Sequence, residues 1–336
     1  MVTSGNKPNG IYIIGNESYE IIYGPEERAE IAALVNIIHP QQTSQSIREN
    51  LEMLHDCEMI FSGWGMAKLD EELLAAAPNL KVVFYGAGSI KGFVTEASWA
   101  RGIRITSSYA ANAVPVAEYT LSQIIFCLKH GWHRANEVRR DKAFLAHDPV
   151  PGSFGTTVGI VSLGMIGRIV CAMLRAFDVK VLVYDPFATE VDAEKLNVEL
   201  TSLEDLFARS DVVSLHTPWL KETEGMITGK LLSSMKRGAS FINTSRGAVV
   251  NEFEMIEVLA LRPDMQAVLD VTWPEPPAAD SPLYTLPNVA LTPHIAGSQD
   301  LECRRMGRYI VQELRQFLNN GMLSWEISQE KSASMA

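Results

Sequence analysis

The segment that decides the fold is TVGIVSLGMIGRIVCAMLRAFDVKVLVYD, residues 157–185. It opens with an apolar run and reaches a turn of small residues at 162–167. A helical pattern follows, with apolar residues recurring every three or four positions. A second apolar run, 179–184, ends in Asp185. The order of strand, turn, helix and strand predicts a βαβ unit with the layout of a dinucleotide site.

Each part of this unit suits a ligand with a pyrophosphate. Glycine lets a backbone approach the pyrophosphate, and a helix N-terminus offers unpaired N–H groups and the positive end of the helix dipole. The acid at the end of the second strand accepts hydrogen bonds from ribose hydroxyls. Ser162 stands where the first glycine of G-x-G-x-x-G is expected. Serine can form this turn if its φ is negative. A βαβ unit without a ligand is the alternative.

Composition limits the class of protein. The 336 residues are enough for two domains, each with its own core. A chain that is 47% hydrophobic and 21% charged is typical of soluble globular proteins. Its 29 basic and 40 acidic residues give a formal net charge of −11, which disfavours nucleic acid and anionic membranes as partners.

The cysteines and the first residues indicate a cytoplasmic protein. The four cysteines are scattered without a C-x-x-C pair, which favours reduced thiols over a disulfide framework. The first ten residues lack the features of an export signal, and the apolar stretch 119–128 is too short to span a membrane. The histidines show no metal-binding spacing, so we expect no metal site.

Strand and helix patterns alternate along the chain and predict an α/β fold with parallel sheets. The expected strands outside the opening segment are 11–14, 59–61, 82–85, 103–106, 212–215, 240–244, 267–270 and 289–291. The expected helices are 25–35, 46–54, 69–77, 96–101, 114–140 with a break near 131, 203–208, 230–235, 252–261 and 301–318. Residues 273–287 are rich in proline and are expected to lack regular structure.

Three chemically distinct residues follow predicted strands in the second half. Arg246 and His294 lie just past strand ends, and Glu275 lies in the proline-rich loop. Because ligands of parallel sheets bind outside the carboxyl ends of strands, the three can share one site. Reducing a ketone beside a carboxylate needs a guanidinium to hold that carboxylate, a proton donor at the carbonyl oxygen, and an acid to orient the donor. Arg246, His294 and Glu275 fit these roles in that order.

Each of these residues also has an ordinary structural explanation. Arg246 can pair with a surface acid, Glu275 can be a solvated loop carboxylate, and His294 can cap a helix. A serine hydrolase is excluded because the chain has no G-x-S-x-G elbow. The hypothesis of an enzyme that reduces such ketones therefore depends on the three residues occurring together with the dinucleotide unit.

Several ordered blocks resemble the D-isomer-specific 2-hydroxyacid dehydrogenase family, which includes formate, phosphoglycerate and D-lactate dehydrogenases. The resemblance covers most of residues 57–318 and is strongest over 158–297. The blocks are YGAG at 85–88, VAE at 116–118, the turn at 158–167, HTP at 216–218, MKRGA at 235–239, INTSRG at 242–247, LDV with EP at 269–276, and TPHIAG at 292–297.

The resemblance implies an NAD-dependent oxidoreductase acting on the CH–OH group of small 2-hydroxy acids, or reducing 2-oxo acids. It implies two Rossmann-like or flavodoxin-like parallel-sheet domains with an active-site cleft between them. The substrate domain would be residues 1–113 plus 302–336, and the NAD-binding domain residues 114–301. A homodimer formed through the cofactor domain is also implied.

The resemblance also assigns roles to individual residues. It implies Arg246, Glu275 and His294 as catalytic residues, and a backbone cradle for the substrate carboxylate. The implied substrate-binding residues are Gly86, Ala87, Gly88, Arg246 and His294. The implied NAD-binding residues are Gly164, Met165, Ile166 and Gly167 near the pyrophosphate, Asp185 at the adenosine ribose, Asp270 near the nicotinamide carboxamide, and His216, Thr217, Pro218, Thr244, Ser245, Arg246, His294 and Gly297. Asp185 favours NAD, because a carboxylate there repels the 2′-phosphate of NADP.

Three positions depart from the family pattern. Ser162 replaces a glycine, Ile90 stands where an aspartate is usual, and Leu220 where a threonine is usual. These departures bear on cofactor affinity and on the shape of the substrate loop. An NAD(H)-binding regulatory or sensor protein with the same fold and little turnover is the alternative function; Ser162 favours it and the intact trio disfavours it. A dimerising scaffold without a ligand would leave the trio unexplained.

Overall fold

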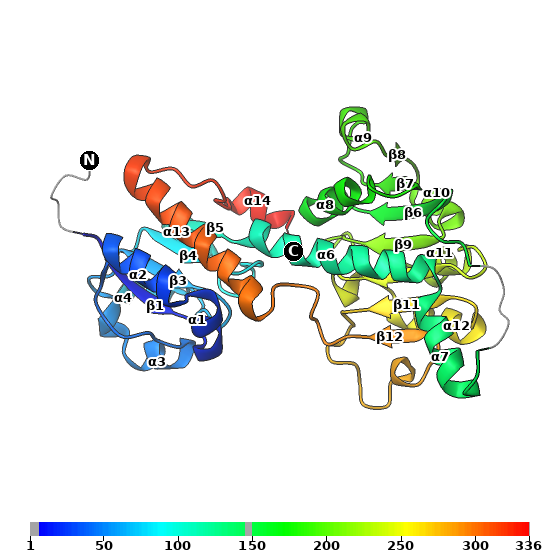
Figure 1. Ribbon diagram of the computed structural model, residues 1–336. Coiled ribbons are helices and arrows are strands. Elements are labelled where there is room, and N and C mark those ends of the chain that lie inside the picture. Colours follow the sequence, from blue (N-terminus) through cyan, green and yellow to red (C-terminus); the bar gives the residue numbers. More distant parts are fainter. Residues whose placement is uncertain (1–6, 145–149, 336) are drawn as a thin grey trace. The chain divides into compact units, whose positions relative to one another are not determined.

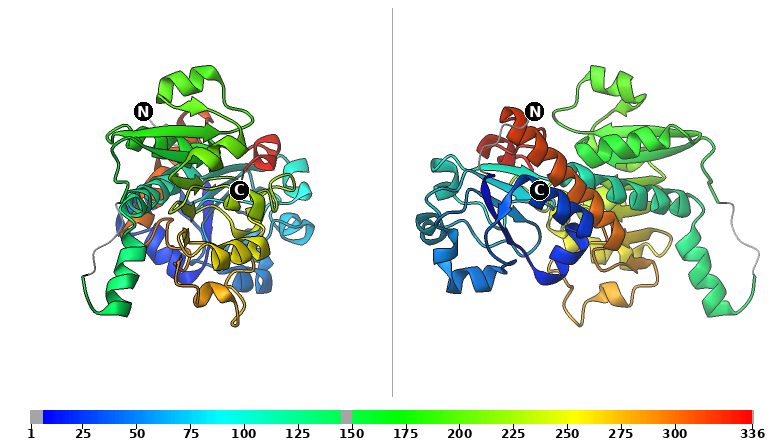
Figure 2. Two further views of the ribbon diagram at one scale, coloured as in Figure 1. Left: turned by 90° about the vertical axis from the view of Figure 1, so that its right-hand side faces the viewer. Right: turned by 60° about the vertical axis from the view of Figure 1, so that its left-hand side comes forward.

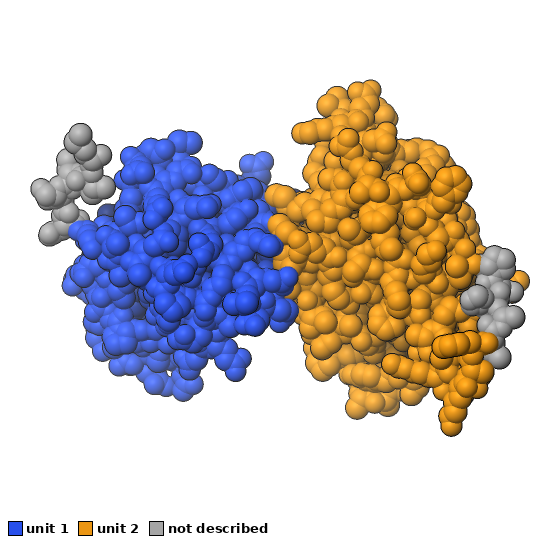
Figure 3. Space-filling model, viewed as in Figure 1, with its two compact units in different colours: residues 1–112, 298–336 blue, residues 113–297 orange. Residues whose placement is uncertain are grey.

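The computed structural model describes residues 7–144 and 150–335, which form two compact units (Figures 1 and 3). One unit combines residues up to 112 with residues from 298 onward, and the other comprises residues 113–297. The bounds expected from the sequence, 113/114 and 301/302, lie close to these. The assignment of substrate binding to the first unit stays a prediction.

The first unit is built on a five-stranded parallel sheet with the order β2–β1–β3–β4–β5. This order is the flavodoxin-like one, in which the first strand lies between the second and the third. The strands are β1 (Asn9–Ile13), β2 (Asn36–Ile37), β3 (Met59–Ser62), β4 (Val82–Tyr85) and β5 (Arg104–Ser107).

Side chains alternate across this sheet and build a core on each face. Ile11 and Ile13 belong to one buried cluster, and Tyr12 and Ile14 belong to the other. The first face is covered by α3 (Ser44–Glu49), the 3₁₀-helix η1 (Leu51–Leu54), α4 (Glu71–Ala76) and α5 (Glu96–Ala100). The second is covered by α1 (Asn16–Ile22), α2 (Pro25–Leu34) and α13 (Cys303–Asn320), which lie side by side in Figure 1. The chain therefore returns to its first sheet after completing the second unit, and ends with α14 (Gln329–Ala333).

The second unit holds a seven-stranded parallel sheet with the order β12–β11–β10–β9–β6–β7–β8. The chain starts at β6 and builds first toward β8, then from β9 toward β12. The direction of building changes between β6 and β9, and ligands of doubly wound sheets bind at such a switch point. The strands are β6 (Thr156–Val161), β7 (Val179–Tyr184), β8 (Glu199–Leu200), β9 (Val212–Leu215), β10 (Ser240–Asn243), β11 (Gln266–Leu269) and β12 (Val289–Leu291).

Helices cover both faces of the second sheet, as the two views in Figure 2 show. One core forms under α6 (Tyr109–Leu128) and α8 (Met165–Leu174), and includes Val158 and Ile160. The other forms under α10 (Leu203–Arg209), α11 (Gly229–Ser233) and α12 (Glu252–Leu261), and includes Val213 and Leu215. The remaining helices are α7 (Gly131–Asp141) and α9 (Glu190–Leu196). No helix in the described part of the chain has the length and apolar character to cross a bilayer.

The predicted α/β class is confirmed, and several element bounds are corrected. The expected helix 46–54 is two elements, because Asn50 leaves the helical conformation at the end of α3. The long helix begins at Tyr109 rather than 114 and carries Pro115 inside it. The expectation of no regular structure in 273–287 is wrong, since a 3₁₀-helix, η3 (Pro282–Tyr284), forms where Ser281 caps the first turn. The short elements α1, α9, α14, β2 and β8 were not predicted.

Candidate active site

The predicted dinucleotide turn joins β6 to α8 at the switch point of the second sheet. Gly164 is the N-cap of α8, no side chain caps that end, and the first turn holds no acid. A Cβ added to Gly164 would meet no atom within 4 Å, whereas one added to Gly167 would lie 2.2 Å from the Ser162 carbonyl oxygen. Gly167 therefore allows the tight turn. Gly164 and Met165, both exposed, leave the helix N-terminus open to an anionic ligand.

Ser162 adopts a φ of +80°. The condition of a negative φ is therefore not met, and the turn keeps the left-handed conformation that glycine favours. Two contacts hold it there: Ser162 N donates to Tyr184 O (2.8 Å), and Leu163 N donates to Asp185 Oδ2 (2.7 Å).

Asp185 lies directly after β7 and faces this turn. Besides Leu163 N, its carboxylate accepts a hydrogen bond from Phe187 N (2.7 Å, to Oδ1). Each carboxylate oxygen has a second lone pair, so the group can still accept from ribose hydroxyls. The predicted ribose acid thus also shapes the backbone of the turn.

His216 and Thr217 follow β9, on the other side of the switch point, where His216 N donates to Val161 O (2.9 Å). Burial lowers the pKa of His216 to about 3, so its ring is neutral, and Nε2 contacts Ser214 Oγ (3.0 Å). Among the described residues, His216 Nδ1 and Thr217 Oγ1 are buried without a hydrogen-bond partner. Since buried polar atoms are nearly always paired, these two atoms fit a bound polar group such as a dinucleotide.

Arg246 lies on the loop after β10, and Asn243 shapes that loop. The Asn243 side chain donates to Arg246 O (3.1 Å) and accepts from Ser245 N (3.0 Å) and Ser245 Oγ (2.9 Å). The guanidinium donates to Ser245 O (2.7 Å) and forms no ion pair with a described residue. Burial lowers the pKa of Arg246, an effect that the charge of Glu275 opposes. The expectation of a surface ion pair for Arg246 is not met, and its charge remains available to an anion.

The loop that carries Arg246 touches the loop that leads to Glu275. A Cβ added to Gly247 would lie 2.0 Å from the carbonyl carbon of Thr272. The second loop is also tied to α12, because Trp273 N donates to Glu252 Oε2 (2.9 Å). Burial raises the pKa of Glu252. The sequence analysis identified neither Asn243 nor Glu252. A polar residue at the end of a buried strand was a signal for Asn243, whereas Glu252 had none.

His294 and Glu275 form a direct pair, with His294 Nδ1 2.6 Å from Glu275 Oε1. About half of the histidine side chain is exposed. His294 has a φ of +55° and lies on the loop after β12, and the next element along the chain begins only at Asp300. It therefore caps no helix, and Glu275 is not an isolated loop carboxylate. The two residues stand at the carboxyl ends of β11 and β12, as expected.

Asp270 is placed differently from a simple ligand-binding acid. Its carboxylate is buried and turned toward the loop of His294, where it binds Thr292 and two backbone amides. The predicted contact of Asp270 with the nicotinamide carboxamide stays a prediction. Its observed partners make it an organiser of the histidine loop.

The other predicted cofactor residues lie around the same strand ends. Thr244 Oγ1 contacts Thr120 Oγ1 of α6 (2.9 Å), and Pro218 O accepts from Thr223 Oγ1 (2.6 Å). Gly297 is the last residue of the second unit. These contacts shape the backbone at the ends of β9 and β10.

The predicted substrate cradle belongs to the first unit. Gly86, Ala87 and Gly88 follow β4, and Ser107 Oγ donates to Ala87 O (2.7 Å) and to Gly88 O (2.6 Å). Ile90, one of the departures from the family pattern, is buried in the core of this unit. The contribution of the cradle to the site stays a prediction.

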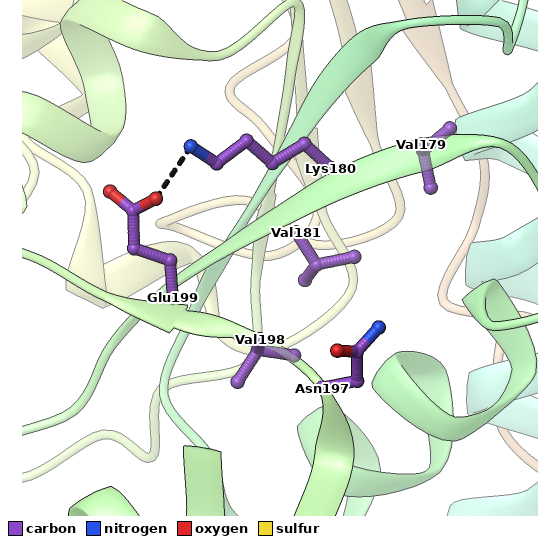
Figure 4. A pocket seen from close by; sticks show the side chains of 6 residues that line it. All are labelled: Val179, Lys180, Val181, Asn197, Val198 and Glu199. Carbon is purple, nitrogen blue, oxygen red and sulfur yellow. Dashed lines mark ion pairs between the residues drawn. The ribbon is translucent and has the colours of Figure 1, made fainter. Parts of the chain in front are cut away.

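A separate pocket of about 270 Å³ lies at one edge of the second sheet (Figure 4). Lys180 and Glu199 face each other there at 2.5 Å. The pocket is lined by the first residues of β7 and by residues 197–199, which lead into β8, whereas the catalytic candidates follow the last residues of β10, β11 and β12. Within residues 7–144 and 150–335, no group of three or more histidine, cysteine or acidic side chains is placed to hold a metal ion.

Comparisons with known proteins agree with this geometry. Residues 121–296 match the family model described as D-isomer specific 2-hydroxyacid dehydrogenase, NAD binding domain. Among curated proteins, the glyoxylate reductase of Thermofilum pendens is 35% identical, over 76% of this chain and 77% of the relative. The D-3-phosphoglycerate dehydrogenase of Mycobacterium leprae is 33% identical, over 74% of this chain and 47% of the relative. The chain thus spans about half the length of the phosphoglycerate dehydrogenases that it matches.

Solved structures show the same architecture. A phosphoglycerate oxidoreductase from Rhizobium etli matches with a TM-score of 0.80 and 22% identity, covering 96% of this chain and 99% of that one, which is evidence for the fold alone. A D-lactate dehydrogenase from Aquifex aeolicus, complexed with NAD and lactic acid, matches with a TM-score of 0.71 and 26% identity, covering 93% and 96%. The chain belongs to the D-isomer-specific 2-hydroxyacid dehydrogenase family, and its second unit is an NAD-binding domain of that family.

Proposed function

We propose that this chain is an NAD(H)-dependent D-2-hydroxyacid dehydrogenase, which in the opposite direction reduces a small 2-oxo acid. The observation that carries the proposal is the 2.6 Å contact between His294 and Glu275, on loops adjoining that of Arg246. A proton donor, an acid that orients it and a guanidinium are the groups that this reaction requires. The names of the glyoxylate reductase and D-lactate dehydrogenase relatives support this substrate class.

Arg246, Glu275 and His294 have different roles in the reaction. Arg246 binds the substrate carboxylate through its planar fork and polarises the neighbouring carbonyl group. Glu275 holds Nδ1 of His294, which leaves Nε2 to give a proton to the carbonyl oxygen. NADH, when bound, supplies the hydride to the carbonyl carbon. In the oxidative direction His294 accepts the hydroxyl proton, and Glu275 balances the charge of the ring.

The second unit offers the groups that NAD needs. The open N-terminus of α8 suits the pyrophosphate, and Asp185 suits the adenosine ribose. Thr217 Oγ1 and His216 Nδ1, buried without partners among the described residues, supply further polar contacts. In the first unit, we assign the backbone of residues 86–88 to the substrate carboxylate.

We also propose a homodimer formed through the cofactor domain, and a cytoplasmic location. The exposed aromatic side chains of this unit include Phe126, Phe144 and Phe154, and α7 has no buried residue. An interface would remove this apolar surface from water. All four cysteines are free and buried, which suits a reducing compartment.

An NAD(H)-binding sensor with little turnover is the second candidate, and the positive φ of Ser162 favours it. A side chain at this position stands where the motif normally presents a glycine to the pyrophosphate. The intact pair of His294 and Glu275 disfavours a role limited to binding.

A panel assay separates the two candidates. NADH oxidation by the whole chain is followed with 2-oxo acids from glyoxylate and hydroxypyruvate to branched and aromatic compounds, beside the variants His294→Gln and Arg246→Ala. We expect rapid turnover with one class of substrate, and a loss of at least about 100-fold in kcat/KM in both variants while NADH still binds. Binding of NADH by the wild type without turnover on any compound would instead support the sensor.

A further inference from the structure

Asp270 holds the loop that carries His294 at several points. Its side chain is only 2% exposed, and its carboxylate accepts hydrogen bonds from Thr292 Oγ1 (2.6 Å), Ile295 N (2.9 Å) and Ala296 N (2.9 Å). Its main-chain oxygen accepts from His294 N (3.0 Å). The side chain of Thr292 and the backbone at and after the histidine are therefore tied to one buried residue.

The hydrogen bonds around Thr292 have a defined direction. Thr292 Oγ1 lies 2.6 Å from a carboxylate oxygen of Asp270 and 2.9 Å from the hydroxyl of Tyr119 on α6. Thr292 Oγ1 donates to Asp270 Oδ1, and a hydroxyl group has a single proton to donate. Tyr119 must then donate its own proton to Thr292. The result is a chain of donors, Tyr119 to Thr292 to Asp270, that ends on the carboxylate.

The surroundings of Tyr119 suit a permanent donor. Burial raises the pKa of Tyr119, and the charge of Asp270 adds to this effect while the contact with Thr292 opposes it. The phenol therefore keeps its proton at neutral pH. A hydrogen bond in such a chain also polarises the next one, so that loss of the first weakens the second.

The hydrogen bonds from Tyr119 to Asp270 help to hold the backbone conformation of His294. A φ of +55° is uncommon for a residue with a side chain and persists only where neighbouring contacts impose it. Glu275 fixes the ring through Nδ1, but it does not fix the backbone. Asp270 and its donors do so from the other side.

We propose that Tyr119 and Thr292 are positioning residues for His294, which through Asp270 hold the loop 292–296 in the conformation that aims the imidazole at the substrate. The inference rests on the proposed function, since it assigns both residues to the same proton transfer. Neither residue needs to touch the substrate.

Substitutions that each remove one hydroxyl test this role in the full-length chain. In Tyr119→Phe, we expect kcat to fall about tenfold, the equivalent of roughly 1.4 kcal/mol, with little change in the KM for NADH or for the 2-oxo acid. The solvent deuterium isotope effect on kcat should rise, because proton transfer becomes slower. Thr292→Val should behave in the same way, and Thr292→Ser, which keeps the hydroxyl, should restore kcat.

The matched control is Tyr109→Phe. Tyr109 lies on the same helix, and its hydroxyl accepts a hydrogen bond from Lys331 Nζ (2.9 Å). We expect this variant to keep the wild-type kcat and isotope effect. An unchanged kcat and isotope effect in Tyr119→Phe, or equal losses in both tyrosine variants, would overturn the proposal.

A second measurement does not depend on turnover. The imidazole signals of ¹⁵N-histidine-labelled protein are recorded by NMR, and those of His294 are assigned by their loss in His294→Gln. We expect them to shift or broaden in Tyr119→Phe but not in Tyr109→Phe. Unchanged signals in Tyr119→Phe would contradict the positioning role even if no 2-oxo acid were reduced, whereas an inactive wild type with the expected NMR changes would count against the proposed function alone.

Discussion

Ser162 keeps a backbone conformation that a side chain disfavours. Its φ of +80° is required by the turn, in which its N–H donates to the end of β7 and its carbonyl oxygen closely approaches Gly167. Such a conformation costs a residue with a Cβ on the order of 1 kcal/mol, and the fixed turn must offset that cost. The site therefore keeps the geometry of the glycine motif without the glycine.

Replacing Ser162 by glycine should stabilise the second unit. We expect Ser162→Gly to raise the free energy of unfolding by about 1 kcal/mol, because glycine adopts a positive φ without steric cost. Urea unfolding is the measurement, and Ser162→Ala, which keeps a Cβ, should bring no gain. Equal stability of the glycine and alanine variants would show that the turn is not strained.

His216 should make stability depend on pH. Burial lowers its pKa from 6.5 in the unfolded chain to about 3, so between these values the unfolded state binds more protons than the folded state. The free energy of unfolding is therefore not reduced by this residue above pH 6.5. It falls as the pH drops toward 3, with a slope of up to about 1.4 kcal/mol per pH unit.

Hydrogen exchange at β9 measures this effect locally, since the two units need not unfold together. In His216→Gln, the stability of β9 should lose part of its dependence on pH within that window. In His133→Gln, a histidine of α7 with a partly exposed side chain, the dependence should remain. The same slope in wild type and His216→Gln would contradict the role of buried, neutral His216.

At the scale of elements, one close approach aligns the loops of the candidate site. The Arg246 loop after β10 and the Glu275 loop after β11 meet at Gly247, where a Cβ would lie 2.0 Å from the backbone of Thr272. The two strands pair in parallel register, so their carboxyl ends already lie at the same edge. Because Gly247 has no side chain, the backbones of the two loops can then come into direct contact.

Two glycine-to-alanine substitutions should differ in their effects on stability and on NADH binding. Gly247→Ala should cost about 2–4 kcal/mol of stability and most of the activity, because backbone atoms must move apart to admit the methyl group. Gly164→Ala should leave stability nearly unchanged, since its Cβ meets no atom within 4 Å, but should weaken NADH binding at the start of α8. Thermal unfolding and NADH fluorescence titration measure both. Loss of stability in Gly164→Ala with normal NADH binding would contradict this assignment.

The elements were predictable to the extent that their patterns are local. Strands such as β4, β9 and β12 were located at their observed bounds, because each is a mainly apolar run that follows a polar residue. β2 and β8 have two residues each, and the N-cap of α1 is a glycine, which has no side chain to cap the helix, so their sequences carry little signal.

In the candidate site too, some residues could be predicted from local patterns and others could not. Arg246, Glu275 and His294 could be predicted, since the carboxyl ends of parallel strands share one edge. Tyr119 could not, because its role depends on a contact with Thr292, 173 positions later in the chain. The conformation of Ser162 was also outside the reach of a sequence pattern, since the closely packed turn fixes its φ.

At the scale of the whole molecule, the chain uses one architectural plan twice. Each unit is a parallel sheet with helices on both faces, and each places a glycine-containing loop or a reactive side chain directly after a strand. Of the two, the second unit carries the NAD-binding domain match, the open helix N-terminus and the paired histidine and glutamate. The proposed chemistry is therefore concentrated in residues 113–297, with the substrate cradle assigned to the other unit.

The most direct test of the central claim follows the transferred hydrogen itself. The whole chain is incubated with NADH that carries deuterium in both positions at C4 and with the best 2-oxo acid of the panel, and the product is examined by mass spectrometry and chiral chromatography. The account predicts one deuterium at C2 of a D-2-hydroxy acid, formed by the wild type and at least about 100-fold more slowly by His294→Gln. A product without deuterium, a product of the L configuration, or equal product from His294→Gln would contradict it.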